Sequence, residues 1–123
     1  MELLFRICLG IASIINLLPA LLVFLPNRIA SSYGIDVPNA NYELLLRHRA
    51  VLFGIVGGLM LYAAISQKYY DLAVVVGLVS MVSFVILVPL VSGDINAALK
   101  KVMYVDLVGI AILVVGFVLF KLQ

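Results

Sequence analysis

The sequence has little charge, one cysteine and one histidine, and each scarcity excludes a class of chemistry. Charged residues make up 11% of its 123 residues, and the formal net charge is +2. Because these charges form no basic cluster, we expect no nucleic-acid partner. Cys8 allows no internal disulfide and, in its apolar run, is predicted to be a small buried hydrophobe. With His48 as the only histidine and no Cys/His cluster, we predict no metal site.

The common catalytic motifs are missing as well. The sequence has no Gly-x-Ser-x-Gly elbow and no second histidine for a catalytic triad. The glycine-rich stretch from Gly54 to Gly58 lacks the Lys-Ser/Thr of a phosphate-binding loop and falls inside an apolar segment. We therefore expect no cofactor, and the sequence disfavours an enzyme.

Apolar sequence, in contrast, is abundant. Hydrophobic residues make up 66% of the chain, and the usual fraction in soluble proteins is about 45–50%. A small domain leaves a large share of its surface exposed, so a soluble fold could not bury this much apolar surface. The sequence therefore predicts a protein whose surroundings are membrane lipids, and we expect it in a bacterial inner (cytoplasmic) membrane.

Four apolar segments have the length that a membrane-spanning helix needs, which is about 20 residues for about 30 Å of hydrocarbon. They are Leu3–Leu25, Tyr42–Ile65, Leu72–Val91 and Ala97–Phe120. The backbone has no water partners in lipid, so each segment should be helical. The prediction is an all-α fold: one integral membrane four-helix bundle over residues 1–123. In the first loop, Pro26 to Gly34 is predicted to form a short interfacial helix.

Small residues mark the faces through which membrane helices pack, because they let two backbones approach. Glycines at helical spacing in the second and fourth segments predict such packing faces. They are Gly54, Gly57, Gly58, Gly109 and Gly116.

Two charged residues lie on extensions of these glycine faces. Arg47 is one heptad before Gly54, and Asp106 is three residues before Gly109. At 1.5 Å per residue their depths differ by about 6 Å, within reach of an extended arginine. Charged residues inside a membrane are usually paired, so we predict an Arg47–Asp106 ion pair inside the bundle. The predicted neighbours of this pair are Glu43, His48, Asn16 and Asp94.

The same helical geometry predicts a different place for Arg49. It is rotated by about 200° from Arg47 and shares a face with Phe53 and Met60. We predict that this face points to lipid and that Arg49 extends to the headgroups. Whether the Arg47–Asp106 pair serves a function or only joins two helices stays open.

The stretch from Leu46 to Gly58 has an arginine before a Gly-Gly-bearing span, after a Pro-Asn-Arg loop with Tyr33-Gly34. In this pattern the chain resembles the small DoxX-like membrane families. The resemblance covers nearly the whole chain in layout but only this stretch in residues. It implies the four-helix architecture and little about activity. Similar chains are sometimes named phosphopantetheine adenylyltransferase, but the His-x-Gly-His motif of that activity is absent here.

Four kinds of function stay open from the sequence, and for the last, an intramembrane enzyme acting on lipids, the residues offer no nucleophile. The first is binding of a lipophilic or anionic ligand at the Arg47–Asp106 cluster, and we favour it. The second is a small proton-coupled transporter or channel using Asp106, although the first segment lacks the central glutamate of small four-helix exporters. The third is a structural or assembly subunit, as a homo-oligomer or with a partner membrane protein.

Overall fold

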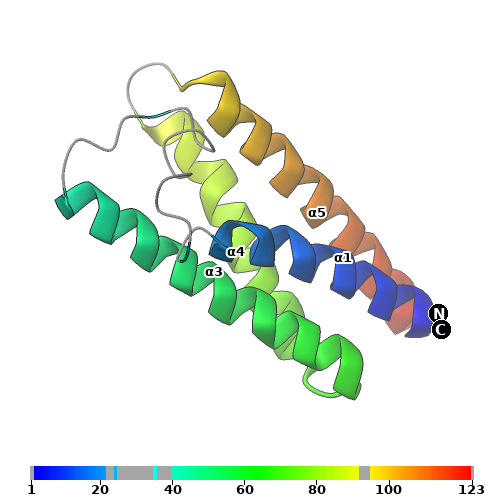
Figure 1. Ribbon diagram of the computed structural model, residues 1–123. Helices are drawn as coiled ribbons and strands as arrows, with labels where there is room; N and C mark the ends of the chain where they lie inside the picture. Colours follow the sequence, from blue (N-terminus) through cyan, green and yellow to red (C-terminus); the bar gives the residue numbers. More distant parts are fainter. Residues whose placement is uncertain (1, 22–23, 25–34, 36–39, 92–94, 123) are drawn as a thin grey trace.

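The computed structural model describes residues 2–21, 24, 35, 40–91 and 95–122 (Figure 1). Within these ranges the chain forms helices and no strand, so the predicted all-α four-helix bundle is confirmed. The helices are α1 (Glu2–Ala20), α3 (Ala40–Ser66), α4 (Tyr70–Leu90) and α5 (Ala97–Leu122). The predicted interfacial helix and Asp94 lie outside the described residues.

Each of these four helices is long and apolar enough to cross a membrane, which makes the chain compatible with a small multi-pass membrane protein. The largest difference from the predicted spans is in α1, which ends at Ala20 instead of Leu25. Its apolar run continues past that point, but the chain turns there, with the amide of Phe24 donating to the carbonyl of Leu21. Hydropathy alone does not detect such a turn, because the residues on both sides of it are apolar.

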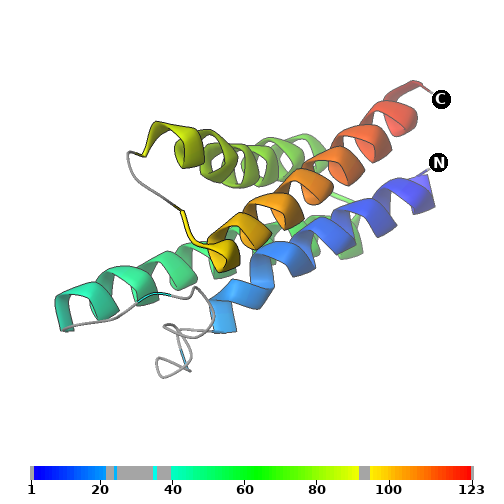
Figure 2. The same cartoon turned by 90° about the horizontal axis from the view of Figure 1, so that it is seen from above.

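The helices form a ring in which α1 packs against α3 and α5, and α4 packs against the same two (Figures 1 and 2). Both chain ends lie at the same end of the bundle, as four crossings require. A tight turn joins α3 to α4, with Gln67 and Tyr69 in the left-handed backbone region at φ 61°. The start of α3 extends beyond the end of α1 in both views.

Helix α3 approaches α1 through its glycine face. A Cβ atom at Gly57 would lie 2.6 Å from the Cγ of Leu17 and 3.0 Å from the backbone oxygen of Ser13. Three residues earlier, a Cβ at Gly54 would lie 3.4 Å from the Cβ of Ala20. The absence of a side chain at Gly57 therefore allows α3 to approach α1 closely, whereas a Cβ at Gly54 would be in ordinary van der Waals contact.

Helix α5 uses glycine in the same way. A Cβ at Gly116 would lie 2.9 Å from the Cβ of Cys8 on α1, and one at Gly109 would lie 2.8 Å from the Sδ of Met81 on α4. Gly58, which the sequence also placed on a packing face, differs from the other four predicted glycines. A Cβ there would meet no atom within 4 Å in the part of the chain that the structure describes.

The buried core concentrates toward the end of the bundle that holds the chain termini. The ring of Phe5 is fully buried and lies 4.9 Å from Tyr70, 5.7 Å from Phe117 and 5.0 Å from Phe120, centroid to centroid. At the opposite end, the first buried residue of α3 is Ala50. The two ends of the bundle are therefore packed to different degrees.

Candidate functional site

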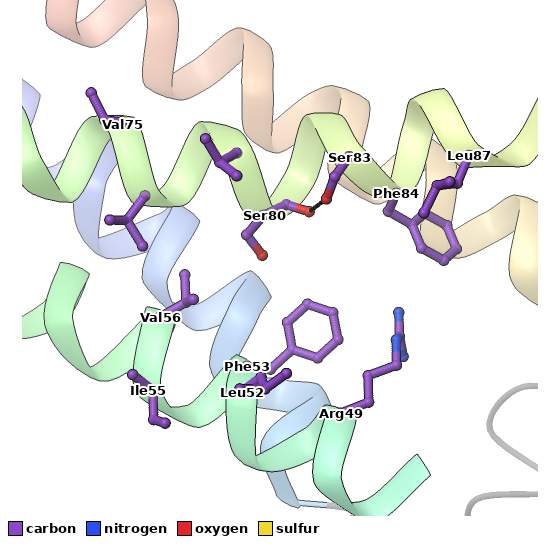
Figure 3. A pocket seen from close by; sticks show the side chains of 12 residues that line it. Arg49, Leu52, Phe53, Ile55, Val56, Val75, Ser80, Ser83, Phe84 and Leu87 are labelled. Atoms are coloured by element: carbon purple, nitrogen blue, oxygen red, sulfur yellow. Dashed lines mark hydrogen bonds between the residues drawn. The ribbon is translucent and has the colours of Figure 1, made fainter. Parts of the chain in front are cut away.

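A cavity of about 490 Å³ lies between α3 and α4 (Figure 3). We call it the α3–α4 groove. Most of its described lining is aliphatic or aromatic, and the polar lining residues are Arg49, Ser80 and Ser83. Several rim residues, Val79 among them, are largely exposed in the structure, so in a membrane the groove would be open to lipid.

The groove forms because α3 and α4 part after their shared turn (Figure 1). Near the turn they are close, and a Cβ at Gly77 of α4 would lie 2.6 Å from the Cε of Met60 on α3. Farther from the turn, the rings of Phe53 and Phe84 stand between the helices (Figure 3). At this level α3 packs on α1 through Gly54, which leaves space on its other side toward α4.

Arg49 lies at one end of the groove, with its side chain across the gap (Figure 3). Its guanidinium carbon is 4.5 Å from the ring centroid of Phe53 and 5.5 Å from that of Phe84. Such cation–π contacts are worth about 0.5–1 kcal/mol at exposed sites and more where water is excluded. The two rings therefore fix the position of the guanidinium at the groove.

This position corrects the prediction that the Arg49 face points only to lipid. Arg49 and Phe53 line the space between α3 and α4, and Met60 on the same face is fully buried. The sequence correctly placed Arg49 on the face of α3 away from its glycines. It could not show that α4 packs near this face, because that depends on a second helix. The four-residue spacing of Arg49 and Phe53 was the usable signal, because side chains at that spacing meet on a helix.

Asp106 lies on α5 and is only 6% exposed. Helices α4 and α5 are antiparallel, and Gly109 packs on Met81. Asp106 is three residues before Gly109, and Phe84 is three residues after Met81. In an antiparallel pair these two positions lie level, so Asp106 is at the depth of Phe84. The guanidinium carbon of Arg49 lies 5.5 Å from the ring centroid of Phe84, at this depth. Arg49 and Asp106 thus belong to one layer of the bundle.

The predicted Arg47–Asp106 ion pair stays a prediction: a salt bridge among the described residues joins Lys121 and Asp71. Helix α1 ends at Ala20, which packs on Gly54 of α3. Arg47 is two turns nearer the start of α3 and therefore lies beyond the helix that its glycine face packs against. Extending a packing face along a helix is valid only while the neighbouring helix continues.

The other predicted neighbours have different environments. Glu43 is half-exposed and His48 is exposed, and neither lines the groove. Asn16 is almost fully buried and lies behind the groove wall. Its Nδ2 donates to the backbone oxygen of Ala12 at 2.9 Å, and its Oδ1 accepts from the Oγ of Ser80 at 2.9 Å. Asn16 therefore connects α1 to a residue of the groove.

The site offers no evident place for a metal ion. Over residues 2–21, 24, 35, 40–91 and 95–122, no group of three His, Cys, Asp or Glu side chains is close enough to hold one. What the groove presents instead is an apolar channel with one guanidinium at its end.

No protein-family model, curated protein or solved structure matches the chain. The resemblance to DoxX-like families therefore stays a prediction. The fold and the site define a class, a small four-helix bundle suited to a membrane with a groove between two of its helices. The function must be argued from that groove.

Proposed function

We propose that this protein binds a lipophilic molecule in the α3–α4 groove, with the polar end of the molecule at Arg49. The observation that carries the proposal is the groove itself. Its volume of about 490 Å³ lies within the usual range of about 300–1,000 Å³ for ligand pockets. Like such pockets, it combines an apolar lining with few polar groups, and Arg49 is the only charged residue of its described lining.

The groove runs along the depth of a bilayer. The twelve steps from Val75 to Leu87 on α4 span about 18 Å, more than half of a hydrocarbon core of about 30 Å. Arg49 lies seventeen residues before the end of α3 at Ser66, or about 26 Å along the helix axis. With Ser66 near one membrane surface, Arg49 is near the other. An amphiphile with its head at Arg49 would keep its tail in the hydrocarbon region.

The serine hydroxyls of the groove suit an apolar occupant. The Oγ of Ser80 donates to Asn16, and the Oγ of Ser83 donates to the backbone oxygen of Ser80 at 3.0 Å. Both protons are therefore used inside the protein. An alkyl chain or ring can lie against this wall without leaving a buried donor unpaired, which would cost about 1–3 kcal/mol.

The test is to fill the groove. Val79 lines it from α4, so Val79→Trp should place an indole in the ligand's space. Native mass spectrometry of the protein purified in a mild detergent is expected to show a defined lipophilic adduct on the wild type and at least fivefold less on this variant. Val115→Trp is the matched control, because Val115 is similarly exposed but belongs to α5, outside the groove. Equal adducts in all three proteins, or none, would contradict the proposal.

Proton-coupled transport is the second candidate, and Asp106 is the observation that favours it. A buried carboxylate inside a membrane helix is unfavourable in lipid and often marks an ion or substrate path. An Asp106→Asn variant in proteoliposomes would then lose substrate-driven proton movement. Retained proton movement in that variant would exclude Asp106 as the coupling group.

Location and assembly are carried forward as predictions. Helices α1, α3, α4 and α5 support a multi-pass membrane protein, and we expect a bacterial inner membrane. Homo-oligomer formation or a partner membrane subunit also stays a prediction, which the mass spectra of the groove test would address.

A further inference from the structure

The groove has the lining and length that suit an alkyl chain. Its described lining covers about 18 Å of α4 and is apolar apart from Arg49, Ser80 and Ser83. Near the turn, Met60 of α3 contacts Gly77 of α4, so the two helices are close there. A chain in the groove would have its methyl end toward the turn and its head at Arg49.

The charge of the groove favours a carboxylate at the other end. A guanidinium has five N–H donors in a planar fork, so it can serve a ligand carboxylate as well as protein partners. The rings of Phe53 and Phe84 hold the Arg49 guanidinium at the groove, so little side-chain freedom is lost on binding. The groove therefore complements a chain that ends in a negative charge.

Asp106 limits how much negative charge the site accepts. Its buried carboxylate lies on the α5 side of the same layer as Arg49. A ligand carboxylate competes with it for one guanidinium. A doubly charged phosphate monoester would add a second uncompensated negative charge in the layer of Asp106, which is more unfavourable.

From these three features we propose that the groove binds a long-chain fatty acid, with its carboxylate at Arg49 and its chain between α3 and α4. This inference rests on the proposed function, because it names the ligand class of the same groove. Arg49 determines the selectivity for the head, and the apolar lining of the groove holds the chain. Asp106 weakens binding by competition.

The test compares four probes on the purified protein by native mass spectrometry in a mild detergent. Palmitic acid has one chain and one charge, and hexadecanol has the same chain without charge. Hexadecyl phosphate has the same chain with up to two charges, and dipalmitoyl phosphatidylglycerol has two chains with one charge. We expect palmitate to bind most tightly of the four.

Variants identify the groups responsible. Arg49→Gln should weaken palmitate binding about tenfold or more, because it removes hydrogen bonds to a charged group, and should leave hexadecanol unchanged. The matched control is Arg47→Gln, which removes the same charge from the same helix but outside the described groove lining. Asp106→Asn should tighten palmitate binding roughly five- to tenfold and reduce the penalty against hexadecyl phosphate. A misfolded variant could not produce this gain.

The outcomes separate the two proposals. If hexadecanol or phosphatidylglycerol binds as tightly as palmitate, independently of Arg49 but blocked by Val79→Trp, the fatty-acid proposal fails and the lipophilic groove stands. If Asp106→Asn weakens palmitate binding, the competition with Asp106 is refuted. If no probe binds to the wild type, both proposals fail.

Discussion

The two ends of the bundle use aromatic rings in opposite ways. At the end with the chain termini, Phe5 packs among Tyr70, Phe117 and Phe120, and the helices are in close contact. At the other end, Phe53 lies beneath the guanidinium of an arginine and lines a groove. Where the rings pack on one another, at the closed end, the helices are in contact. Where Phe53 packs on the guanidinium of Arg49, at the open end, a groove lies between the helices. The open end is therefore the place to look for a ligand.

The charged residues also differ between the two ends of the bundle: they are exposed at the closed end, and Asp106 is buried at the open end. At the closed end, the Nζ of Lys121 lies 3.2 Å from Asp71, with both side chains more than half exposed. Exposed ion pairs of this kind contribute about 0–1 kcal/mol to stability. Arg6 there donates from Nε to the backbone oxygen of Ala64 at 2.7 Å. At the open end, Asp106 is buried inside a membrane-spanning helix, where an ionised group is far more unfavourable.

Replacing one phenylalanine at each end by alanine would test the contrast between the closed and the open end. It has the largest expected effect of the tests. Phe5→Ala should lower the free energy of unfolding by about 3–5 kcal/mol, because the ring is fully buried. Phe53→Ala should cost less stability, because that side chain is only partly buried, but should weaken palmitate binding. Unfolding in a denaturing detergent measures the first effect and native mass spectrometry the second. Equal losses of stability and binding in both variants would refute the division between the ends.

Glycine substitutions on α3 test the packing that gives rise to the groove. Gly57→Ala should destabilise the fold by about 1–3 kcal/mol, because its Cβ would meet Leu17 and the backbone of Ser13. Gly58→Ala is the matched control in the next position. Its Cβ would meet nothing within 4 Å, so the better helix propensity of alanine should leave stability unchanged or raised by up to about 1 kcal/mol. If Gly58→Ala destabilised the fold more than Gly57→Ala, the described packing of α3 on α1 would be contradicted.

A serine pair on α4 tests the hydrogen bond behind the groove wall. Ser80→Ala removes a donor to the buried Oδ1 of Asn16 and should lower stability by about 0.6 kcal/mol, the average for such bonds in membrane bundles, and by at most about 1.7 kcal/mol. Ser83→Ala removes only a bond within its own helix and should change stability by less. Unfolding in a denaturing detergent would compare the two. A larger effect at Ser83 would show that this contact matters little.

The sequence predicts the helices better than it predicts their relations. The four spans follow from length and apolar character alone, and glycine spacing indicated four residues that lie at close approaches. Met60 and Arg49 were misplaced because their environment depends on α4, whose direction is not encoded in α3. The cation that the structure places in the layer of Asp106 is Arg49, on the opposite face of α3 from Arg47. Depth along a membrane helix can be counted from the sequence, whereas its rotation and the end of its neighbour depend on several helices together.

The central claim is that the open end of the bundle binds an alkyl chain between α3 and α4. The most direct measurement is photo-crosslinking with palmitic acid that carries a diazirine along its chain, followed by mapping of the labelled peptides. The account predicts labels concentrated on residues 52–56 of α3 and 75–87 of α4, and their loss in Val79→Trp. Labels spread over all four helices in proportion to their exposed surface, unchanged by Val79→Trp, would contradict it.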